Sequence, residues 1–245
     1  MKILVCITHV PDTTSKIAFT HNDTEFDTTG IQYVIGPYDD YALARAVELK
    51  EQHGGSITAL NVGGPETEPT LRKALAIGAD DAIRVNTTPS DSFLVATEIA
   101  NAAKDGSYDL ILMGRESIDF NGGMVHGMVG ELLGIPSLSP VMKLDIEGNT
   151  AKLAREIEGG KEYLEVDLPL VAGCQEPIAE WKIPNMRGIM MARSKPLSVV
   201  DPSGGGEKTK TESYELPTEK TEVKMIDADN VDDLVRLLKE EAKVL

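Results

Sequence analysis

The sequence predicts an α/β fold: a doubly wound, mainly parallel sheet with an antiparallel hairpin extension and a C-terminal arm. Short runs rich in Val, Ile and Leu alternate with helical segments through the first half of the chain, which is typical of strands buried on both faces. Tight turns between strands follow residue 140, and a stretch with few apolar residues follows residue 200. Doubly wound sheets bind ligands at the carboxyl ends of their strands, so we expect the functional site there.

Four apolar runs predict parallel strands, and segments of helical composition lie between them. We expect strands at residues 3–7, 57–62, 82–85 and 108–113, and helices at 39–53, 66–77 and 91–104. Leu71, Ala74, Leu75 and Gly78 share one helical face, which is typical of a helix packed on a sheet. A fourth helix is expected to follow Met124 and to run through Leu133.

The second half predicts antiparallel strands. The turn 147–149 separates strands expected at 141–146 and 151–158, and further strands are expected at 163–166 and 170–171. We expect these strands to extend or flank the parallel sheet, so that residues 1–200 form one nucleotide-binding α/β domain.

Residues 201–245 predict an extended arm followed by an amphipathic helix. From 201 to about 224 the chain is rich in Gly, Lys, Thr, Glu and Pro. Val231, Leu234, Val235 and Leu238 then recur at helical spacing, with Asp229 or Asn230 placed as the N-cap. Such a helix folds back on its own domain or packs on a partner, and the sequence alone favours neither.

The charge balance disfavours two classes of partner. The 245 residues carry 24 Lys and Arg against 40 Asp and Glu, a formal net charge of -16. Such a chain repels phosphate backbones and anionic lipid, so neither nucleic-acid binding nor membrane insertion is expected. No apolar run approaches the ~20 residues of a membrane span, and the first residues show no signal-peptide pattern. We therefore expect a cytoplasmic, bacterial protein.

The sequence offers no persuasive catalytic or metal-binding set, so we expect a carrier or binding protein rather than an enzyme. Cys6 and Cys174 lie far apart and fit small buried hydrophobes better than a disulfide or a zinc site. No nucleophile elbow, dinucleotide fingerprint or P-loop is present. The histidines lie in separate segments, and the acidic pair at 39–40 is more typical of a solvated helix end than of an acid–base pair.

Three turns that contain Gly or Pro are expected to meet on one rim of the sheet, as in a nucleotide cleft. They are residues 8–13, 62–65 and the loop that follows Met113. In that last loop, Gly122 and Gly123 precede the expected helix, where backbone N–H groups and the helix dipole can hold a phosphate. The same pattern also fits an ordinary strand-to-helix turn.

Residues 182–195 form a basic, Met-rich segment on an otherwise acidic chain. They hold four basic residues and no acidic one, whereas residues 1–181 hold 13 basic and 28 acidic residues. Flexible, polarizable Met side chains beside cations suit a surface that docks on acidic partners. The alternative interpretation is a core helix with extended Arg and Lys side chains.

The chain resembles the β subunits of electron-transfer flavoproteins over essentially all of residues 1–200. The motifs that carry the resemblance are Gly36-Pro37-Tyr38-Asp39, Ala74 to Asp80, Gly114 to Asp119, Arg155 to Glu162 with Leu168-Pro169, and Ile183-Pro184-Asn185-Met186. The resemblance implies a Rossmann-like, adenine-nucleotide α-hydrolase-like fold. It also implies a non-catalytic subunit of a heterodimer, in which a larger α subunit holds most of the FAD.

The resemblance further implies that the chain buries an AMP in its cleft and shares the FAD with the α subunit. Tyr38 would approach the flavin, and its ring suits shielding of an isoalloxazine from water. By position, the cofactor-binding residues would be Cys6, Gly36, Pro37, Tyr38, Asp39, Val62, Gly114, Arg115, Glu116, Ser117, Ile118, Asp119, Phe120, Asn121, Gly122, Gly123, Met124 and Val125.

Partner contacts are implied at two places. Glu156 would influence the orientation of the mobile flavin domain of the α subunit. Ile183, Pro184, Asn185, Met186 and Arg187 would belong to a recognition loop, with Ile183 as its apolar anchor. The electron donors implied are acyl-CoA dehydrogenases, and the acceptor is an electron-transfer flavoprotein-quinone oxidoreductase.

One departure from the family leaves the nucleotide open. Where many members have side-chain phosphate ligands, this chain reads Asn121-Gly122-Gly123-Met124-Val125-His126, so backbone N–H groups would replace them. Some relatives bind a second FAD in this cleft and bifurcate electrons. A stand-alone nucleotide-binding enzyme or stress-type sensor is another alternative, although the loop after the first strand lacks an S-G-G-x-D-S pattern. A third is an assembly factor with an empty cleft.

Overall fold

The computed structural model describes residues 1–218 and 223–245, and its contacts divide the chain into two compact units. The first comprises Met1–Ala18 and Asp27–Glu212, and the second comprises Phe19–Phe26 and Ser213–Leu245. Residues 219–222, which belong to the predicted arm, lie outside the described residues. The predicted domain boundary at residue 200 stays a prediction.

A nine-stranded sheet forms the centre of the first unit, with the strand order β11-β10-β9-β12-β8-β1-β6-β7-β13. The parallel strands expected from the sequence are confirmed as β1 (Lys2–Cys6), β6 (Ser56–Val62), β7 (Asp81–Val85) and β8 (Leu110–Gly114). The strand order reverses between β1 and β8, because β6 and β7 lie on one side of β1 and β8 lies on the other. This reversal is where a doubly wound sheet opens a crevice.

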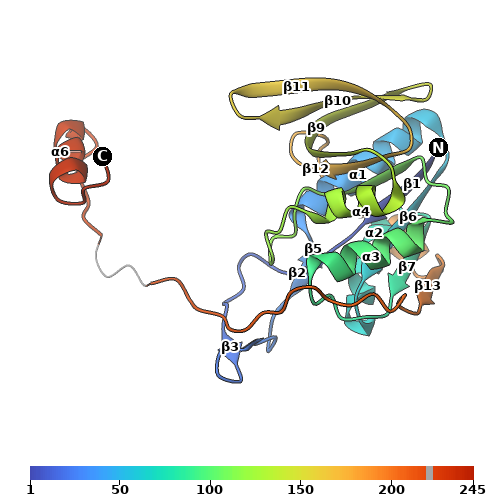
Figure 1. Cartoon of the computed structure of the whole chain (residues 1–245), viewed down its shortest axis with the longest axis horizontal. Helices are drawn as coiled ribbons and strands as arrows, with labels where there is room; N and C mark the ends of the chain where they lie inside the picture. The colour runs from blue at the N-terminus through green and yellow to red at the C-terminus, as the bar shows by residue number, and fades with distance from the viewer. Residues whose placement is uncertain (219–222) are drawn as a thin grey trace. The chain divides into compact units, whose positions relative to one another are not determined.

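Two pairs of helices cover the two faces of the sheet (Figure 1). On one face, α1 (Pro37–His53) and α2 (Glu68–Ile77) contribute buried Leu43, Leu71 and Leu75. On the other, α3 (Ser92–Ala103) and α4 (Val125–Leu133) contribute Ile99 and Val129. The prediction of a doubly wound fold is therefore confirmed, and a short 3-10 turn, η1 (Pro65–Thr67), precedes α2.

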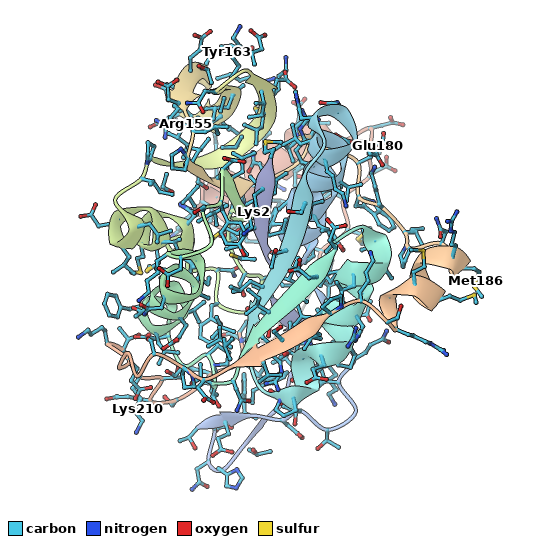
Figure 2. All side chains as sticks on the ribbon, turned by 90° about the vertical axis from the view of Figure 1, so that its right-hand side faces the viewer. Lys2, Arg155, Tyr163, Glu180, Met186 and Lys210 are labelled. Atoms are coloured by element: carbon cyan, nitrogen blue, oxygen red, sulfur yellow. The ribbon has the colours of Figure 1, made fainter. Side chains whose placement is uncertain are left out.

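The antiparallel extension is confirmed at one edge of the same sheet, with one correction. Strands β9 (Ser137–Glu147), β10 (Thr150–Ile157) and β11 (Gly160–Asp167) pair antiparallel in that order. The strand expected at 170–171 is not antiparallel: β12 (Leu170–Cys174) is buried throughout and runs parallel to both β8 and β9. Figure 2 shows Tyr163 on the outermost strand, where its side chain is 75% exposed.

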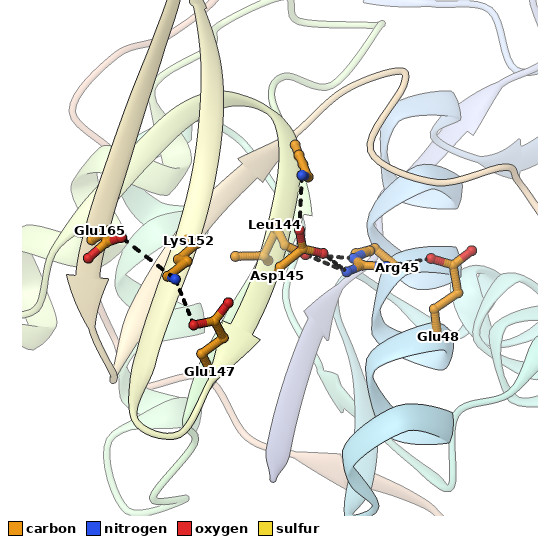
Figure 3. Close-up of polar contacts among 8 residues, drawn as sticks. Arg45, Glu48, Leu144, Asp145, Glu147, Lys152 and Glu165 are labelled. Atoms are coloured by element: carbon orange, nitrogen blue, oxygen red, sulfur yellow. Dashed lines mark hydrogen bonds and ion pairs between the residues drawn. The ribbon is translucent and has the colours of Figure 1, made fainter.

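A buried arginine ties this extension to the helical layer. Arg45 on α1 donates from Nε to the Leu144 carbonyl of β9 at 2.8 Å, and its guanidinium pairs with Glu48 at 2.7 Å and with Asp145 at 2.9 Å (Figure 3). Lys152 in the same view pairs with Glu147 and Glu165 on the surface of the hairpin. The two ion-pair groups thus differ mainly in burial.

Several elements were not expected from the sequence. Strand β13 (Leu197–Val200) extends the sheet parallel to β7. A helix was the alternative interpretation of the basic segment, and α5 (Met186–Ala192) does lie there, but Ala192 is its one buried residue, so it is not a core helix. Strands β2 (His9–Pro11) and β5 (Tyr33–Ile35) form a small antiparallel sheet beside the carboxyl end of β1. No helix in the described part of the chain is long and apolar enough to cross a membrane.

The second unit contains the predicted C-terminal helix. Helix α6 (Val231–Glu240) begins after Asn230, whose side chain accepts a hydrogen bond from the Asp233 N–H at 3.4 Å, so Asn230 is the N-cap. Within the same unit, β3 (Phe19–Thr20) pairs with β4 (Glu25–Phe26), and the Phe19 ring stacks on Tyr214 with centroids 4.8 Å apart.

Candidate functional site

A cleft of about 680 Å³ opens at the carboxyl ends of β1, β6 and β8. Its walls include Thr8 and His9 after β1, Val62 at the end of β6, and the loop from Gly114 to Val125 after β8. The expectation that these three turns meet on one rim is therefore confirmed. The volume lies within the range of about 300–1,000 Å³ that is typical of small-molecule sites.

Asp39 joins the two central strands at the floor of the cleft. Its side chain, in the first turn of α1, accepts hydrogen bonds from the Thr8 N–H at 2.8 Å and from the Gly114 N–H at 2.7 Å. Asp39 is 2% exposed, so the prediction of a solvated helix end is wrong for this residue. Burial raises the pKa of its carboxyl group to about 6, although the hydrogen bonds favour the charged form. The carboxylate thereby holds β1, β8 and α1 at fixed distances.

Two glycines allow this close approach. A side chain at Gly36 would collide with the Thr8 hydroxyl and the Asp39 carboxylate. At Gly114, a Cβ atom would lie 2.7 Å from both Asp39 Oδ1 and Tyr38 Cβ. The motif Gly36-Pro37-Tyr38-Asp39 is therefore needed for the geometry at the start of α1, where Gly36 is the N-cap and Pro37 is the first helical residue.

The predicted cofactor residues divide into those that line the cleft and those that build its frame. Gly36, Pro37, Tyr38, Ile118 and Asn121 are not among the lining residues, and the first three form the start of α1. The predicted residues that do line the cleft are Cys6, Asp39, Val62, Gly114, Arg115, Glu116, Ser117, Asp119, Phe120, Gly122, Gly123, Met124 and Val125.

The start of α4 lines the cleft with backbone groups that are suited to bind an anion. Gly122 and Gly123 precede the N-cap Met124, and no side chain of the described residues caps this helix. Gly123 has a φ of 58°, a left-handed conformation that glycine adopts without strain. The free N–H groups of the first turn, together with the helix dipole, favour a negatively charged ligand.

The other charged groups on the wall are mostly acidic. Asp39, Glu66, Asp91, Glu116 and Asp119 line the cleft, and the one arginine there, Arg115, donates to Glu116 at 2.9 Å. Burial raises the pKa of Asp119. This wall opposes a ligand with many negative charges, so an anion would be accepted chiefly at the α4 N-terminus.

The structure adds lining residues that the sequence did not indicate. Tyr33 of β5 stacks on His9 with centroids 4.2 Å apart, and His9 shares a hydrogen bond with the Thr70 hydroxyl at 2.8 Å. Asp91 also lines the cleft, and its position before α3 is an N-cap signal that could have been noticed in the sequence. Tyr33 comes from a distant segment and carries no local signal.

His126 and Asn61 bring unpaired polar atoms to the cleft. The Nδ1 atom of His126 and the Oδ1 atom of Asn61 are buried without a hydrogen-bond partner in the described part of the chain. Burial lowers the pKa of His126. Such atoms are suited to hydrogen bonds with a bound molecule, because leaving them unpaired is costly.

Both thiols are buried, as expected. Cys6 is 6% exposed and Cys174 is 0% exposed, and burial raises the pKa of each thiol. Cys6 lines the cleft as a small apolar surface.

The basic segment has one anchored face and one exposed face. Arg72 of α2 donates to the Ala192 and Lys195 carbonyls, and Lys195 donates to the Leu75 and Ala79 carbonyls at the end of α2. The predicted partner residues lie on the free side: Ile183 is 76% exposed and Met186, seen in Figure 2 projecting from α5, is 75% exposed.

Of the other predicted partner residues, Asn185 accepts from the Gly188 N–H at 2.8 Å and so caps α5, while Arg187 is exposed and Pro184 is partly buried. Glu156 lies on β10, exposed, and accepts a hydrogen bond from Gln175 at 2.8 Å. The structure therefore places Glu156 and the Ile183 segment on separate elements of the first unit.

The family model and the similar proteins all point to the same family. The model of the electron transfer flavoprotein domain matches residues 23–204. The chain is 36% identical to an electron transfer flavoprotein subunit beta of Bacillus subtilis, with all of both chains covered. It is 34% identical to a protein of the same name from Syntrophomonas wolfei, covering 90% of this chain and 87% of that one. It is also 32% identical to an acryloyl-CoA reductase electron transfer subunit gamma of Anaerotignum propionicum, covering 82% and 78%.

Proposed function

The chain belongs to the electron transfer flavoprotein family, and on that premise we propose that it carries electrons, together with an α subunit, through a shared FAD. We propose acyl-CoA dehydrogenases as the donors, a quinone-linked oxidoreductase as the acceptor, and the cytoplasm as the location of this chain. The observation that carries the proposal is the end-to-end similarity to a β subunit, at 36% identity over the whole of both chains.

We infer that the cleft binds AMP and does not catalyse a reaction. Its free N–H groups at the start of α4 lie at one end, where they would hold the phosphate, and Cys6 and Val62 supply apolar wall for the base. Asp39, the acidic group at the floor, already accepts backbone hydrogen bonds from Thr8 and Gly114. AMP would therefore serve as a structural ligand.

FAD, when bound in the heterodimer, supplies the one- and two-electron chemistry that links the two partners. This chain would contribute Tyr38, whose ring is partly buried beside the cleft with the Arg115 guanidinium 4.7 Å from its centroid. A ring held by a cation on one side is rigid, and it would exclude water from the flavin.

Docking of the dehydrogenase is assigned to the exposed side of residues 182–195. Ile183 would enter an apolar pocket, while Arg187 and Arg193 would steer an acidic surface toward it. Helix α6, whose Val231, Leu234 and Val235 side chains are exposed, would pack on the α subunit. Deletion of residues 225–245 should then impair heterodimer assembly, whereas full assembly of the truncated chain would count against this contact.

A second FAD in the cleft is the alternative that one observation favours. The cavity extends beyond the AMP residues to the stacked pair His9 and Tyr33, so it has room for more than a mononucleotide.

Counting nucleotides distinguishes these possibilities. The heterodimer is purified and denatured. The nucleotides that it releases are then separated and quantified. One FAD and one AMP per heterodimer support the simple carrier, whereas two FAD and no AMP would establish the bifurcating form. Release of no nucleotide would favour an assembly factor, and ATP hydrolysis by the isolated chain would favour a stand-alone enzyme.

A further inference from the structure

Three side chains form a continuous hydrogen-bonded path from the cleft to β10, the strand next to the edge strand β11. Arg115 Nη1 donates to Gln175 Oε1 at 2.9 Å, and Gln175 Nε2 donates to Glu156 Oε2 at 2.8 Å. Arg115 follows β8, Gln175 follows β12, and Glu156 lies on β10. The path therefore crosses three elements that are far apart in the sequence.

Gln175 suits the central position because its side-chain amide both accepts and donates hydrogen bonds. It is 6% exposed, so its amide is removed from competing water. A guanidinium only donates and a carboxylate only accepts, so the amide oxygen must face Arg115 and the amide nitrogen must face Glu156. The amide dipole is thus aligned between a positive and a negative group, which strengthens both hydrogen bonds.

The cleft end of the path lies where a bound ligand would contact it. Arg115 lines the cleft and donates from Nε and Nη2 to Glu116, another lining residue, at 3.2 and 2.9 Å. A molecule bound beside Glu116 would compete for the hydrogen bonds of the Arg115 guanidinium, which also donates to Gln175 at 2.9 Å. A shift of the Arg115 guanidinium would therefore change its hydrogen bond to the buried Gln175 amide.

At the other end of the path, the Glu156 carboxylate is exposed to solvent. Glu156 faces Lys161 across the β10–β11 ladder, yet within residues 1–218 and 223–245 it forms no ion pair. Its neighbour Arg155 does pair across the same ladder, with Glu162 at 2.5 Å. Glu156 is instead oriented by Gln175, and its remaining acceptor positions are available to a partner.

We propose that Gln175 is a positioning residue that couples the cleft to Glu156, so that the ligand bound in the cleft sets the orientation of this exposed carboxylate. The inference rests on the proposed function in one respect: Glu156 is taken to influence the flavin domain of the α subunit. Gln175 itself belongs to none of the motifs that indicated the family.

Side-chain NMR tests the path without any electron transfer. The chain has three glutamines, Gln32, Gln52 and Gln175, so their side-chain amide signals are readily assigned with Gln175→Glu as reference. In nucleotide-stripped heterodimer with a ¹⁵N-labelled chain, addition of AMP should shift the Gln175 signal and leave that of Gln52 on α1 unchanged. Glu156→Gln should also shift the Gln175 signal. A Gln175 signal that stays in place in either experiment would overturn the proposal.

Kinetics of the FAD-containing heterodimer test the consequence. Gln175→Leu removes both hydrogen bonds, whereas Gln175→Glu keeps an acceptor for Arg115 and places a like charge beside Glu156. Each should lower the rate of flavin reduction by a dehydrogenase by about fivefold to tenfold, and Glu156→Gln should lower it to the same extent, with FAD and AMP contents unchanged. The double variant Gln175→Leu with Glu156→Gln should lose no more than either single variant.

Glu176→Gln is the matched control, because Glu176 is the next residue and its side chain accepts an exposed hydrogen bond from the Tyr41 hydroxyl. The rate of this variant should stay at the wild-type value. Additive losses in the double variant would overturn the proposal, and so would failure of both Gln175 variants to fold, since Gln175 would then be structural. If the wild-type heterodimer carries no flavin, the proposed function fails, while the NMR experiment still decides the role of Gln175.

Discussion

The Asp39 carboxylate accepts a hydrogen bond from the Gly114 backbone N–H at 2.7 Å, across the point where the strand order of the sheet reverses. The same carboxylate accepts from Thr8 after β1. One buried side chain at the start of α1 therefore fixes both strands that form the floor of the cleft. This link has a direct consequence for stability.

Replacement of Asp39 by Asn should lower the free energy of unfolding by about 2 kcal/mol, because an amide cannot accept all the hydrogen bonds that the carboxylate accepts and a buried N–H is left unpaired. Urea unfolding of the full chain measures this. Asp105→Asn, at an exposed turn, is the control and should leave the unfolding midpoint unchanged. Equal midpoints for both variants would show that Asp39 does not hold the strands together.

Asp40 should give the chain a pH-dependent stability. Burial raises the pKa of its carboxyl group to about 6, opposed by the charge of Lys73. The folded state therefore binds the proton more tightly than the unfolded state, so the free energy of unfolding should fall as pH rises from about 4 to 6. Asp40→Asn should reduce this slope, measured by urea unfolding at pH 4.5 and pH 7, and an unchanged slope would contradict the assignment.

Arg45 should contribute far more to stability than Lys152, although both form several ion pairs (Figure 3). Arg45→Met leaves the Leu144 carbonyl without its buried donor and should cost about 2–4 kcal/mol. Lys152→Met removes exposed pairs and should cost at most about 1 kcal/mol. Chemical denaturation of the two variants compares them, and similar losses would mean that burial of the Arg45 group is not decisive.

Ile183→Ala should weaken docking of a dehydrogenase and leave the fold intact, because the side chain is 76% exposed. The KM for the dehydrogenase should rise about tenfold, as expected for an apolar anchor, with FAD content unchanged. Val199→Ala, at a half-exposed β-branched residue of β13, is a control for the loss of an apolar surface side chain and should not alter the KM. Loss of flavin from the Ile183 variant would assign the segment a structural role instead.

The parallel half of the fold was predictable because strands buried on both faces read as continuous apolar runs, as residues 3–7 and 57–62 do. The direction of β12 was not, because five buried residues have no period that distinguishes parallel from antiparallel pairing. The short exposed strand β13 gave no signal above that of a loop.

The candidate site shows the same division. Its strand-end loops could be placed on one rim from topology alone, and Gly36 and Gly114 prove necessary for the close approach to Asp39. Tyr33 reaches the cleft from a separate small sheet, and Gln175 acquires its role only through the orientation of its side chain. Such contacts depend on tertiary structure and leave no local pattern in the sequence.

Anaerobic reduction of the heterodimer tests the carrier function most directly. The chain is purified with its α subunit and mixed with an acyl-CoA dehydrogenase and its acyl-CoA substrate, and the flavin absorbance of the heterodimer is followed. We expect complete reduction of one FAD per heterodimer, dependent on the dehydrogenase. A heterodimer that holds no FAD, or whose FAD stays oxidised when the dehydrogenase and substrate are both present, would contradict the proposed function.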